Sequence, residues 1–288
     1  MATWNCFLYH NLTRARSDSA KLSLGHDVDF LLFEKQIANL KASYDVITPS
    51  EAVYNLNSGK KGKFATIWFD DAFKSVSTIA FPILSSFNLP AAVSVCSSMY
   101  NRETVFWRYK LQALIKLGYE KELVGFLNKE IGRKFWKRTT LKNDSITFFD
   151  FQFIQGLDSF IKFKGLNEFI SSMHDDFCNK QEIEELQNKG WEITNHSSMH
   201  YPITESSAFN LIEDEFSSNS SQIYEDFKIA SPFLVAPFSR EGKMDERVRD
   251  FAAGLVKKNQ YLVLVNEKKN TLNNLKKGLI YRHTARVL

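Results

Sequence analysis

The sequence contains no long hydrophobic run. A membrane-spanning helix needs about 18 or more consecutive apolar residues, and no stretch of this chain reaches that length. Residues 1–10 also lack the basic start and the apolar segment of a secretory signal peptide. We therefore expect a cytoplasmic protein without a transmembrane segment.

Cysteine is scarce, and its positions form no pairs. Cys6, Cys96 and Cys178 are odd in number, lie far apart and contain no CxxC motif, which argues against a disulfide framework. Two of them fall in apolar runs that are typical of strands. Free, buried thiols in a reducing compartment are the simplest interpretation.

Neither sign of charge dominates the composition. The 37 basic and 33 acidic residues leave a formal charge of +4, so we expect no nucleic-acid partner. Basic clusters at residues 60–63 and 133–138 are explained most simply by solvated loops and helix ends. The interpretation left open is contact with a phosphate-bearing substrate, or peripheral contact with a membrane surface.

Apolar residues are abundant and follow an alternating pattern of strands and helices. The 288 residues are 44% apolar, enough for one substantial core. Short β-branched or aromatic runs predict buried strands over residues 3–9, 44–48, 64–69, 91–96, 191–194, 233–235 and 261–265. Helical spacing predicts helices over residues 30–41, 75–87 and 183–189. This succession indicates an α/β fold with a parallel sheet, open or closed into a barrel.

One stretch departs from this alternation. Residues 101–176 are helical in pattern, with aromatic and basic residues mixed at positions 106–110 and again at 135–137. We expect them to form a helical insertion within a single catalytic domain that spans residues 1–288.

Two carboxylates end one of the predicted strands. Asp70 and Asp71 follow an apolar run in residues 66–72, TIWFDDA. Adjacent carboxylates at a strand tip can divide the work, because one can ligate a cation while the other accepts a proton from water. The alternative for such a position is a helix cap, in which an aspartate binds free backbone amides.

Two histidines follow another predicted strand. His196 and His200 are four residues apart, a spacing that lets both imidazoles reach one metal on a helical turn. A third protein ligand is then needed, and an aspartate oxygen meets that need. Polar surface residues are the alternative for a histidine pair of this kind.

These segments together resemble the polysaccharide deacetylases, the NodB-homology carbohydrate esterases. Residues 68–72, WFDDA, are similar to the family motif T-F-D-D-G, and residues 196–202, HSSMHYP, are similar to H-[S/T]-x-x-H-P. Tyr9 and His10 near the start, and GWEI at residues 190–193, agree with the family pattern. The resemblance covers most of the chain apart from the insertion.

The resemblance implies a fold, a cofactor and a set of site residues. The fold is a distorted (β/α) barrel of about seven parallel strands, a relative of the barrels that carry chemistry at the strand ends. A divalent transition metal, Zn²⁺ foremost, is held by Asp71, His196 and His200. Asp70 is then the general base. Residues 236–239, APFS, are similar to the family's third motif, in which the residue after proline, here Phe238, donates its backbone N–H to the oxyanion.

Several positions depart from the family pattern. Ala72 and Ser239 each replace a glycine, and Val235 stands where many members carry an arginine that orients the base. Arg240 and Arg282 are the candidates to replace that arginine. The family's late histidine, its general acid, has no clean match, so His283 is nominated for the role.

The remaining histidines have weaker interpretations. His10 at the end of the first predicted strand lines the same pocket or forms an ordinary rim or core contact. His26 with Asp27, and residues 174–176, HDD, lie in loop-like sequence and are read as exposed polar residues.

We therefore expect a metal-dependent hydrolase that removes an N-acetyl or similar acyl group from a sugar by cleaving a C–N bond outside peptides. The expected partner is an acetylated sugar or oligosaccharide, a precursor in surface polysaccharide biosynthesis, with lipid-linked and nucleotide-linked forms both open. The alternative is a catalytically silent relative that binds glycan or acts as a scaffold. Deformylation remains a related option, and so do cobalt, nickel and iron in the metal site.

Overall fold

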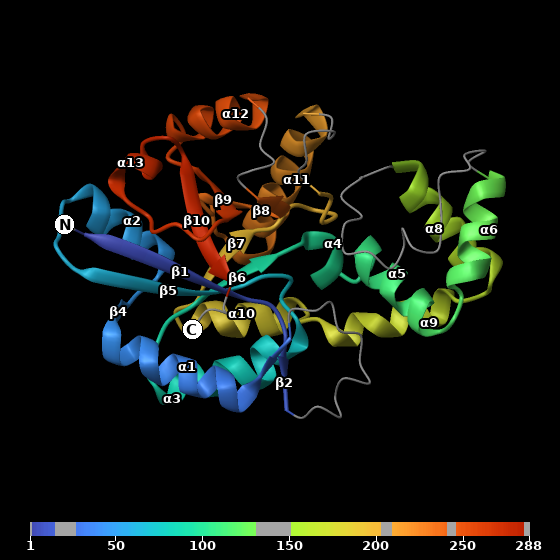
Figure 1. Cartoon of the computed structure of the whole chain (residues 1–288), viewed down its shortest axis with the longest axis horizontal. Coiled ribbons are helices and arrows are strands. Elements are labelled where there is room, and N and C mark those ends of the chain that lie inside the picture. Colours follow the sequence, from blue (N-terminus) through green and yellow to red (C-terminus); the bar gives the residue numbers. More distant parts are fainter. Residues whose placement is uncertain (1, 15–26, 131–150, 203–208, 241–245, 285–288) are drawn as a thin grey trace.

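Seven parallel strands close into a barrel. A computed structural model describes residues 2–14, 27–130, 151–202, 209–240 and 246–284. The ring runs in the order β1–β10–β9–β8–β7–β6–β5, and β5 pairs with β1 over its whole length (Figure 1). Its strands are β1 (Thr3–Tyr9), β5 (Lys63–Phe69), β6 (Ala92–Val95), β7 (Glu192–Asn195), β8 (Phe233–Arg240), β9 (Tyr261–Val265) and β10 (Leu279–Thr284). The expected (β/α) barrel is confirmed.

The predicted strands and the ring differ at two places. Residues 44–48 contribute only the two-residue β4 (Asp45–Val46), which pairs with the start of β5 outside the ring. Strand β10, which the sequence pattern did not indicate, completes the ring instead. The basic pair Arg282 and His283 interrupts its apolar run, and that interruption hid the strand.

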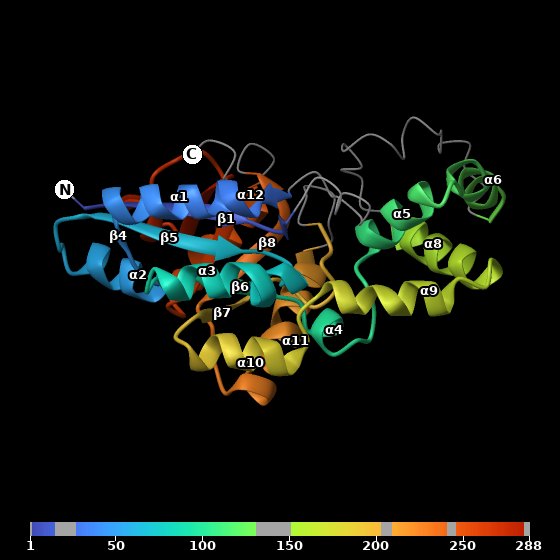
Figure 2. The same cartoon turned by 90° about the horizontal axis from the view of Figure 1, so that it is seen from below.

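Helices cover the outside of the barrel (Figures 1 and 2). They are α1 (Phe30–Ser43), α2 (Pro49–Asn57), η2 (Val76–Ala80) with α3 (Phe81–Ser86), α4 (Ser97–Tyr100), α10 (Lys180–Asn188), α11 (Phe209–Phe227), α12 (Glu246–Val256) and α13 (Leu272–Leu275). Two short parallel strands, β2 (Leu12–Thr13) and β3 (Val28–Asp29), precede α1. The three predicted helices correspond to α1, to η2 with α3, and to α10.

Three of these helices begin after a residue whose side chain accepts backbone N–H groups of the first turn. Asp29 accepts the N–H groups of Leu31 and Leu32 at the start of α1. Capping boxes start α2, with Thr48 and Glu51, and α10, with Asn179 and Glu182. Each cap satisfies backbone donors that a helix leaves free at its first turn.

A second group of helices lies to one side of the barrel, between β6 and β7 in the chain (Figure 1). It comprises α5 (Trp107–Lys116), α6 (Glu120–Glu130), α8 (Phe151–Phe163), α9 (Asn167–Ser172) and η3 (Met173–Asp176). These helices share a hydrophobic cluster that includes Leu114, Leu123 and Leu157. The basic residues at 133–138 lie outside the described part of the chain.

Large aromatic side chains fill the inside of the barrel. The ring of Trp68 on β5 lies 5.6 Å from that of Phe233 on β8, across the barrel from it. Trp4 is fully buried and donates its Nε1–H to Thr66 Oγ1 at 2.7 Å. Because every second residue of a strand points inward, Asp70 and Arg282 lie at the top of this same interior column.

Within the described ranges, no helix has the length and apolarity that a membrane crossing requires.

Candidate metal centre and catalytic site

The carboxyl ends of the strands bring the predicted site residues together. Asp70 and Asp71 follow β5, and the N–H of Asp70 bonds to Tyr9 O at 3.0 Å at the end of β1. His196 follows β7, and its N–H bonds to Val95 O at 3.0 Å at the end of β6. Parallel strands in a closed ring all end on one rim, so residues distant in sequence meet there.

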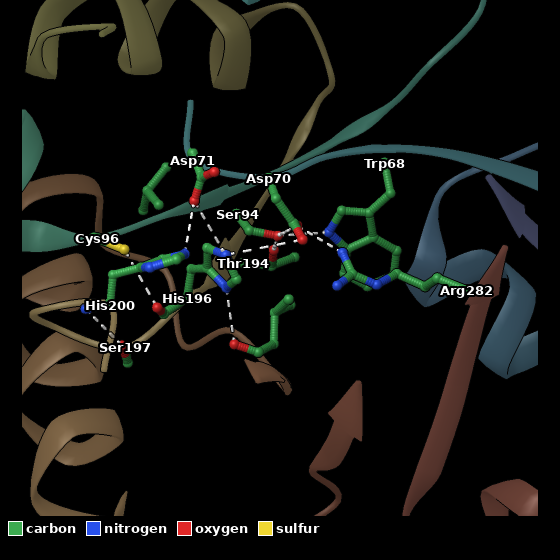
Figure 3. Close-up of polar contacts among 12 residues, drawn as sticks. Trp68, Asp70, Asp71, Ser94, Cys96, Thr194, His196, Ser197, His200 and Arg282 are labelled. Atoms are coloured by element: carbon green, nitrogen blue, oxygen red, sulfur yellow. Dashed lines mark hydrogen bonds and ion pairs between the residues drawn. The ribbon is translucent and has the colours of Figure 1, made fainter. Parts of the chain in front are cut away.

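Asp71, His196 and His200 form a compact, buried cluster (Figure 3). Asp71 Oδ1 lies 3.0 Å from His200 Nε2 and 3.3 Å from His196 Nε2. One ligand atom from each of the three residues lies within 4.8 Å of the others. All three side chains are buried, so these donors face one another away from bulk water.

The donor arrangement fits a divalent metal. His196 Nδ1 lies 2.9 Å from the carbonyl oxygen of Val235, which fixes the proton on Nδ1 and turns the lone pair of Nε2 toward Asp71. Asp71 Oδ1 is buried and receives no hydrogen bond within the described residues. Lone pairs that face each other in a buried place repel unless a cation lies between them. Two imidazoles and one carboxylate are a usual ligand set for catalytic zinc.

The two histidines of the cluster change the pKa of the Asp71 carboxylate. Burial raises the pKa of Asp71, but His200 and His196 outweigh burial and hold that pKa well below its usual range. For His200, burial is the dominant effect and lowers its pKa. For His196, burial lowers the pKa, but Asp70 and Asp71 outweigh burial and raise it. A bound cation would therefore have to displace a proton there, because only the neutral imidazole ligates.

The loops that carry the ligands use left-handed backbone. Asp71 and Ala72 have φ values of 67° and 48°, and Ser197 and His200 have 66° and 57°. Ala72 replaces the family's glycine and still adopts positive φ. A non-glycine residue in this region costs on the order of 1 kcal/mol, so the turn is held against local strain by its surroundings.

Asp70 is held beside the cluster by an arginine from another strand (Figure 3). Arg282 Nη1 donates to Asp70 Oδ1 at 2.6 Å, and Ser94 Oγ donates to the same oxygen at 2.8 Å. Burial raises the pKa of Asp70, but Arg282 and His196 outweigh it and lower the pKa to about 2. Arg282 on β10 therefore supplies the contact that Val235 on β8 lacks. The side chain of Arg240 lies outside the described part.

Phe238 lies at the mouth of the cluster. It has φ of 54° in an irregular part of β8, and its ring lies 4.9 Å from that of His200. Two more aromatic rings lie at this mouth, at the start of α5. The ring of Phe106 lies 4.8 Å from that of His200, and the ring of Trp107 lies 5.7 Å from that of Phe238. The helices between β6 and β7 thus reach the metal ligands, which the sequence did not show.

His283 does not join the other site residues. It follows the inward-pointing Arg282 on β10 and so points to the outer face of the barrel. Its ring lies 5.9 Å from that of Phe7, and its Nδ1 lies 3.1 Å from Glu267 Oε2. Phe7 belongs to the hydrophobic layer beneath α1. The expectation that His283 is the general acid therefore lacks support from its position.

His10 lies closer to the chemistry than the sequence could establish. It comes directly after Tyr9, whose carbonyl oxygen binds the N–H of Asp70. Burial raises the pKa of Asp70, and several positive charges lower it. The charge of His10 is one of them. The backbone of His10 therefore follows directly on the residue that binds the candidate base.

The weaker candidates take part in other contacts. Asp27 accepts a hydrogen bond from Asn11 at 2.9 Å, and Asp176 accepts one from Tyr109 at 2.8 Å. Both carboxylates line a cavity of about 380 Å³ beside β2, and none of the three candidate metal ligands lines it. His174 is buried rather than exposed, contrary to expectation, and His26 lies outside the described residues.

The three cysteines are free thiols and are buried, as expected. Burial raises the pKa of each of them. Cys96 donates its thiol hydrogen to the carbonyl oxygen of His196 at 3.3 Å. It supports the backbone of a candidate ligand and does not present a reactive thiolate.

Comparison with known proteins agrees with the motifs and the geometry. The chain resembles the structure of PplD, a deacetylase from Streptococcus pyogenes that was solved in complex with acetate. The identity is 15% and the TM-score 0.61, and the match covers 98% of this chain and 92% of that one. It also resembles a de-N-acetylase from Aggregatibacter actinomycetemcomitans, with 13% identity and a TM-score of 0.59 over 99% of this chain and 96% of that one. The third similar structure is IcaB from Ammonifex degensii, with 14% identity and a TM-score of 0.59 over 98% of this chain and 91% of that one. No curated protein sequence matches the chain. The sequence model of the polysaccharide deacetylases matches residues 57–255, and the chain belongs to that family.

Proposed function

We propose that this protein is a metal-dependent carbohydrate deacetylase that hydrolyses an N-acetyl or similar acyl group on a sugar. One observation carries the proposal. A buried Asp–His–His set lies beside a second aspartate, Asp70, that an arginine holds ionised. A binding protein needs neither the ligand set nor the ionised base next to it.

Each residue has a chemical task in this proposal. Asp71, His196 and His200 would hold a divalent cation, Zn²⁺ foremost, and when bound it would supply Lewis acidity for the acyl carbonyl and the attacking water. Asp70 accepts the proton of that water, and Arg282 keeps its carboxylate oriented. The backbone N–H of Phe238 stabilises the oxyanion.

The leaving amine needs a proton, and His10 is the proposed donor. His10 directly follows Tyr9, the last residue of β1, whose carbonyl oxygen binds the N–H of Asp70, whereas His283 points to the outer face of β10. When the C–N bond breaks, the amine nitrogen takes the His10 proton and the acyl carbon keeps the water oxygen. The products are acetate and the free amino sugar.

The substrate class and location belong to the same proposal. The relative from Streptococcus pyogenes is described in complex with acetate, and acetate is the acid product proposed here. Free, buried thiols support a reducing compartment. We therefore keep the cytoplasmic precursor of a surface polysaccharide, lipid-linked or nucleotide-linked, as the expected substrate.

Metal content and acetate release test the proposal together. Purified protein should contain about one equivalent of transition metal, and His196→Ala should contain none. Wild type should release acetate from one of a panel of N-acetylated sugars and nucleotide sugars. Asp70→Asn should keep its metal and lose turnover by roughly 10²–10⁴-fold.

Two results would count against the enzyme. A wild-type protein that is metal-free and takes up no added zinc would remove the proposed mechanism. A metal-loaded protein that binds glycan equally well with Asp70 or Asn at position 70, and releases no acetate, would favour the silent relative.

A further inference from the structure

The two histidine ligands are anchored in different ways. The ring of His196 is oriented by its own hydrogen bond, from Nδ1 to the carbonyl oxygen of Val235. Nδ1 of His200 is buried and makes no hydrogen bond within the described part. The position of the His200 ring therefore depends on the backbone that carries it and on aromatic contacts.

That backbone is a strained loop. Ser197 and His200 both have left-handed φ, at 66° and 57°. Each such residue costs on the order of 1 kcal/mol, and the conformation persists only where the surroundings enforce it. The enforcing contacts are hydrogen bonds to the loop's N–H groups.

Glu215 on α11 makes two of those contacts. Its carboxylate oxygen Oε2 accepts the N–H of Met199 at 2.7 Å. Its backbone carbonyl oxygen accepts the N–H of Ser198 at 3.2 Å. The carboxylate is thus bonded to the residue directly before His200.

The neighbouring turn of α11 holds the start of the same loop. Asn219, one turn after Glu215, donates to Asn195 Oδ1 at 2.8 Å, and that oxygen also accepts the N–H of Ser197 at 2.9 Å. Ser220 Oγ accepts a hydrogen bond from Asn195 Nδ2 at 2.7 Å. One face of α11 therefore fixes the loop from its first residue to the one before His200.

We propose that Glu215 is a positioning residue for the metal centre, which sets the place of His200 through the Met199 N–H. The inference rests on the proposed metal-dependent function. Without the carboxylate, the Met199 N–H loses its acceptor and the left-handed turn relaxes. The His200 nitrogen then leaves its place 3.0 Å from Asp71.

Zinc affinity of the purified protein, measured by competition with a chromophoric chelator, tests this role. Loss of an outer contact to a metal ligand lowers affinity by about 10- to 100-fold. We expect a loss of about 10-fold in Glu215→Ala, at the lower end of this range, because the carboxylate bonds to Met199 and not to His200 itself. Glu215→Gln keeps an acceptor oxygen at the same length and should remain close to wild type. Glu213→Ala, an exposed position on the same helix, is the matched control and should not differ from wild type.

Cobalt substitution gives a second reading of the same role. With His200 displaced, the visible absorption of bound Co²⁺ should weaken in Glu215→Ala, because a lost nitrogen ligand is replaced by water. If Glu215→Ala does not fold, Glu215→Asp decides, since its shorter carboxylate falls short of Met199 and should also bind zinc more weakly.

The outcomes separate the inference from the function on which it rests. Wild-type zinc affinity in Glu215→Ala or in Glu215→Asp would overturn the inference alone. Equal weakening in the Gln and Ala variants would also overturn it, because the carboxylate charge would then be the cause. A wild-type protein that binds no zinc would instead remove the proposed function.

Discussion

Arg282 is a fully buried cation at the top of the barrel interior. Its guanidinium carbon lies 5.4 Å from the centre of the Trp68 ring, and Asp70 neutralises its charge. Breaking a buried ion pair by removing one partner costs about 3–5 kcal/mol. Arg282 therefore links the stability of the barrel to the orientation of the candidate base.

Replacing Arg282 should separate base orientation from metal binding. Arg282→Gln removes the charge that holds Asp70 in place, and kcat should fall by about 10²-fold, as expected for a misplaced catalytic group. Zinc content should stay at the wild-type level, because none of the three ligands bonds to Arg282. Assays well below the lowered unfolding temperature, with Arg282→Lys as the charge-retaining control, check this. A Gln variant with wild-type kcat would show that Asp70 needs no arginine.

His10 and His283 are the two candidates for the general acid, and we expect opposite results when each is replaced. His10→Gln should lower kcat by roughly 10²-fold or more, because the leaving amine loses its proton donor. His283→Gln should keep kcat within about 3-fold of wild type, since its ring lies outside the barrel beside Glu267. Steady-state kinetics on both variants decide the assignment, and a larger loss in His283→Gln would reverse it.

At the scale of elements, strands with uninterrupted apolar runs were predictable and β10 was not. Residues 64–69 and 91–96 show the pattern of strands buried on both faces. In β10 the inward Arg282 occupies a place where the pattern expects an apolar side chain. A charged residue that pairs inside a barrel is thus the feature that hides a strand from pattern analysis.

The site was predictable to the extent that it follows strand ends. Asp70, Asp71 and His196 directly follow buried strands, so the rim of a parallel barrel had to collect them. The partners of these residues were not predictable. Arg282 lies 212 positions from Asp70, and Phe106 reaches His200 from outside the barrel pattern. Such pairings depend on the closed ring and leave no local signal.

At the scale of the whole molecule, metal binding should stabilise the fold. The three ligands follow β5 and β7, which lie on either side of β6. They come together only when these strands have paired, so the folded state binds the cation far better than the unfolded chain. Free zinc at about 100 times Kd adds about 2.7 kcal/mol of stability, which corresponds to a rise in Tm of about 5 °C for a domain of this size.

Calorimetry with and without zinc checks this coupling. Wild type should show the rise, a chelator should reverse it, and His196→Ala should show neither effect. An equal rise in His196→Ala would place the stabilising ion elsewhere on the protein.

The order of strands around the ring has a consequence for biosynthesis. Strand β1 lies between β5 and β10, so the ring stays open on the ribosome until residues 279–284 have left the exit tunnel. Until then, Asp70 has no guanidinium beside it and β1 keeps one edge unpaired. An exposed strand edge is prone to wrong pairing, so slow synthesis of the residues between β5 and β10 would prolong the period in which a nascent chain depends on chaperones.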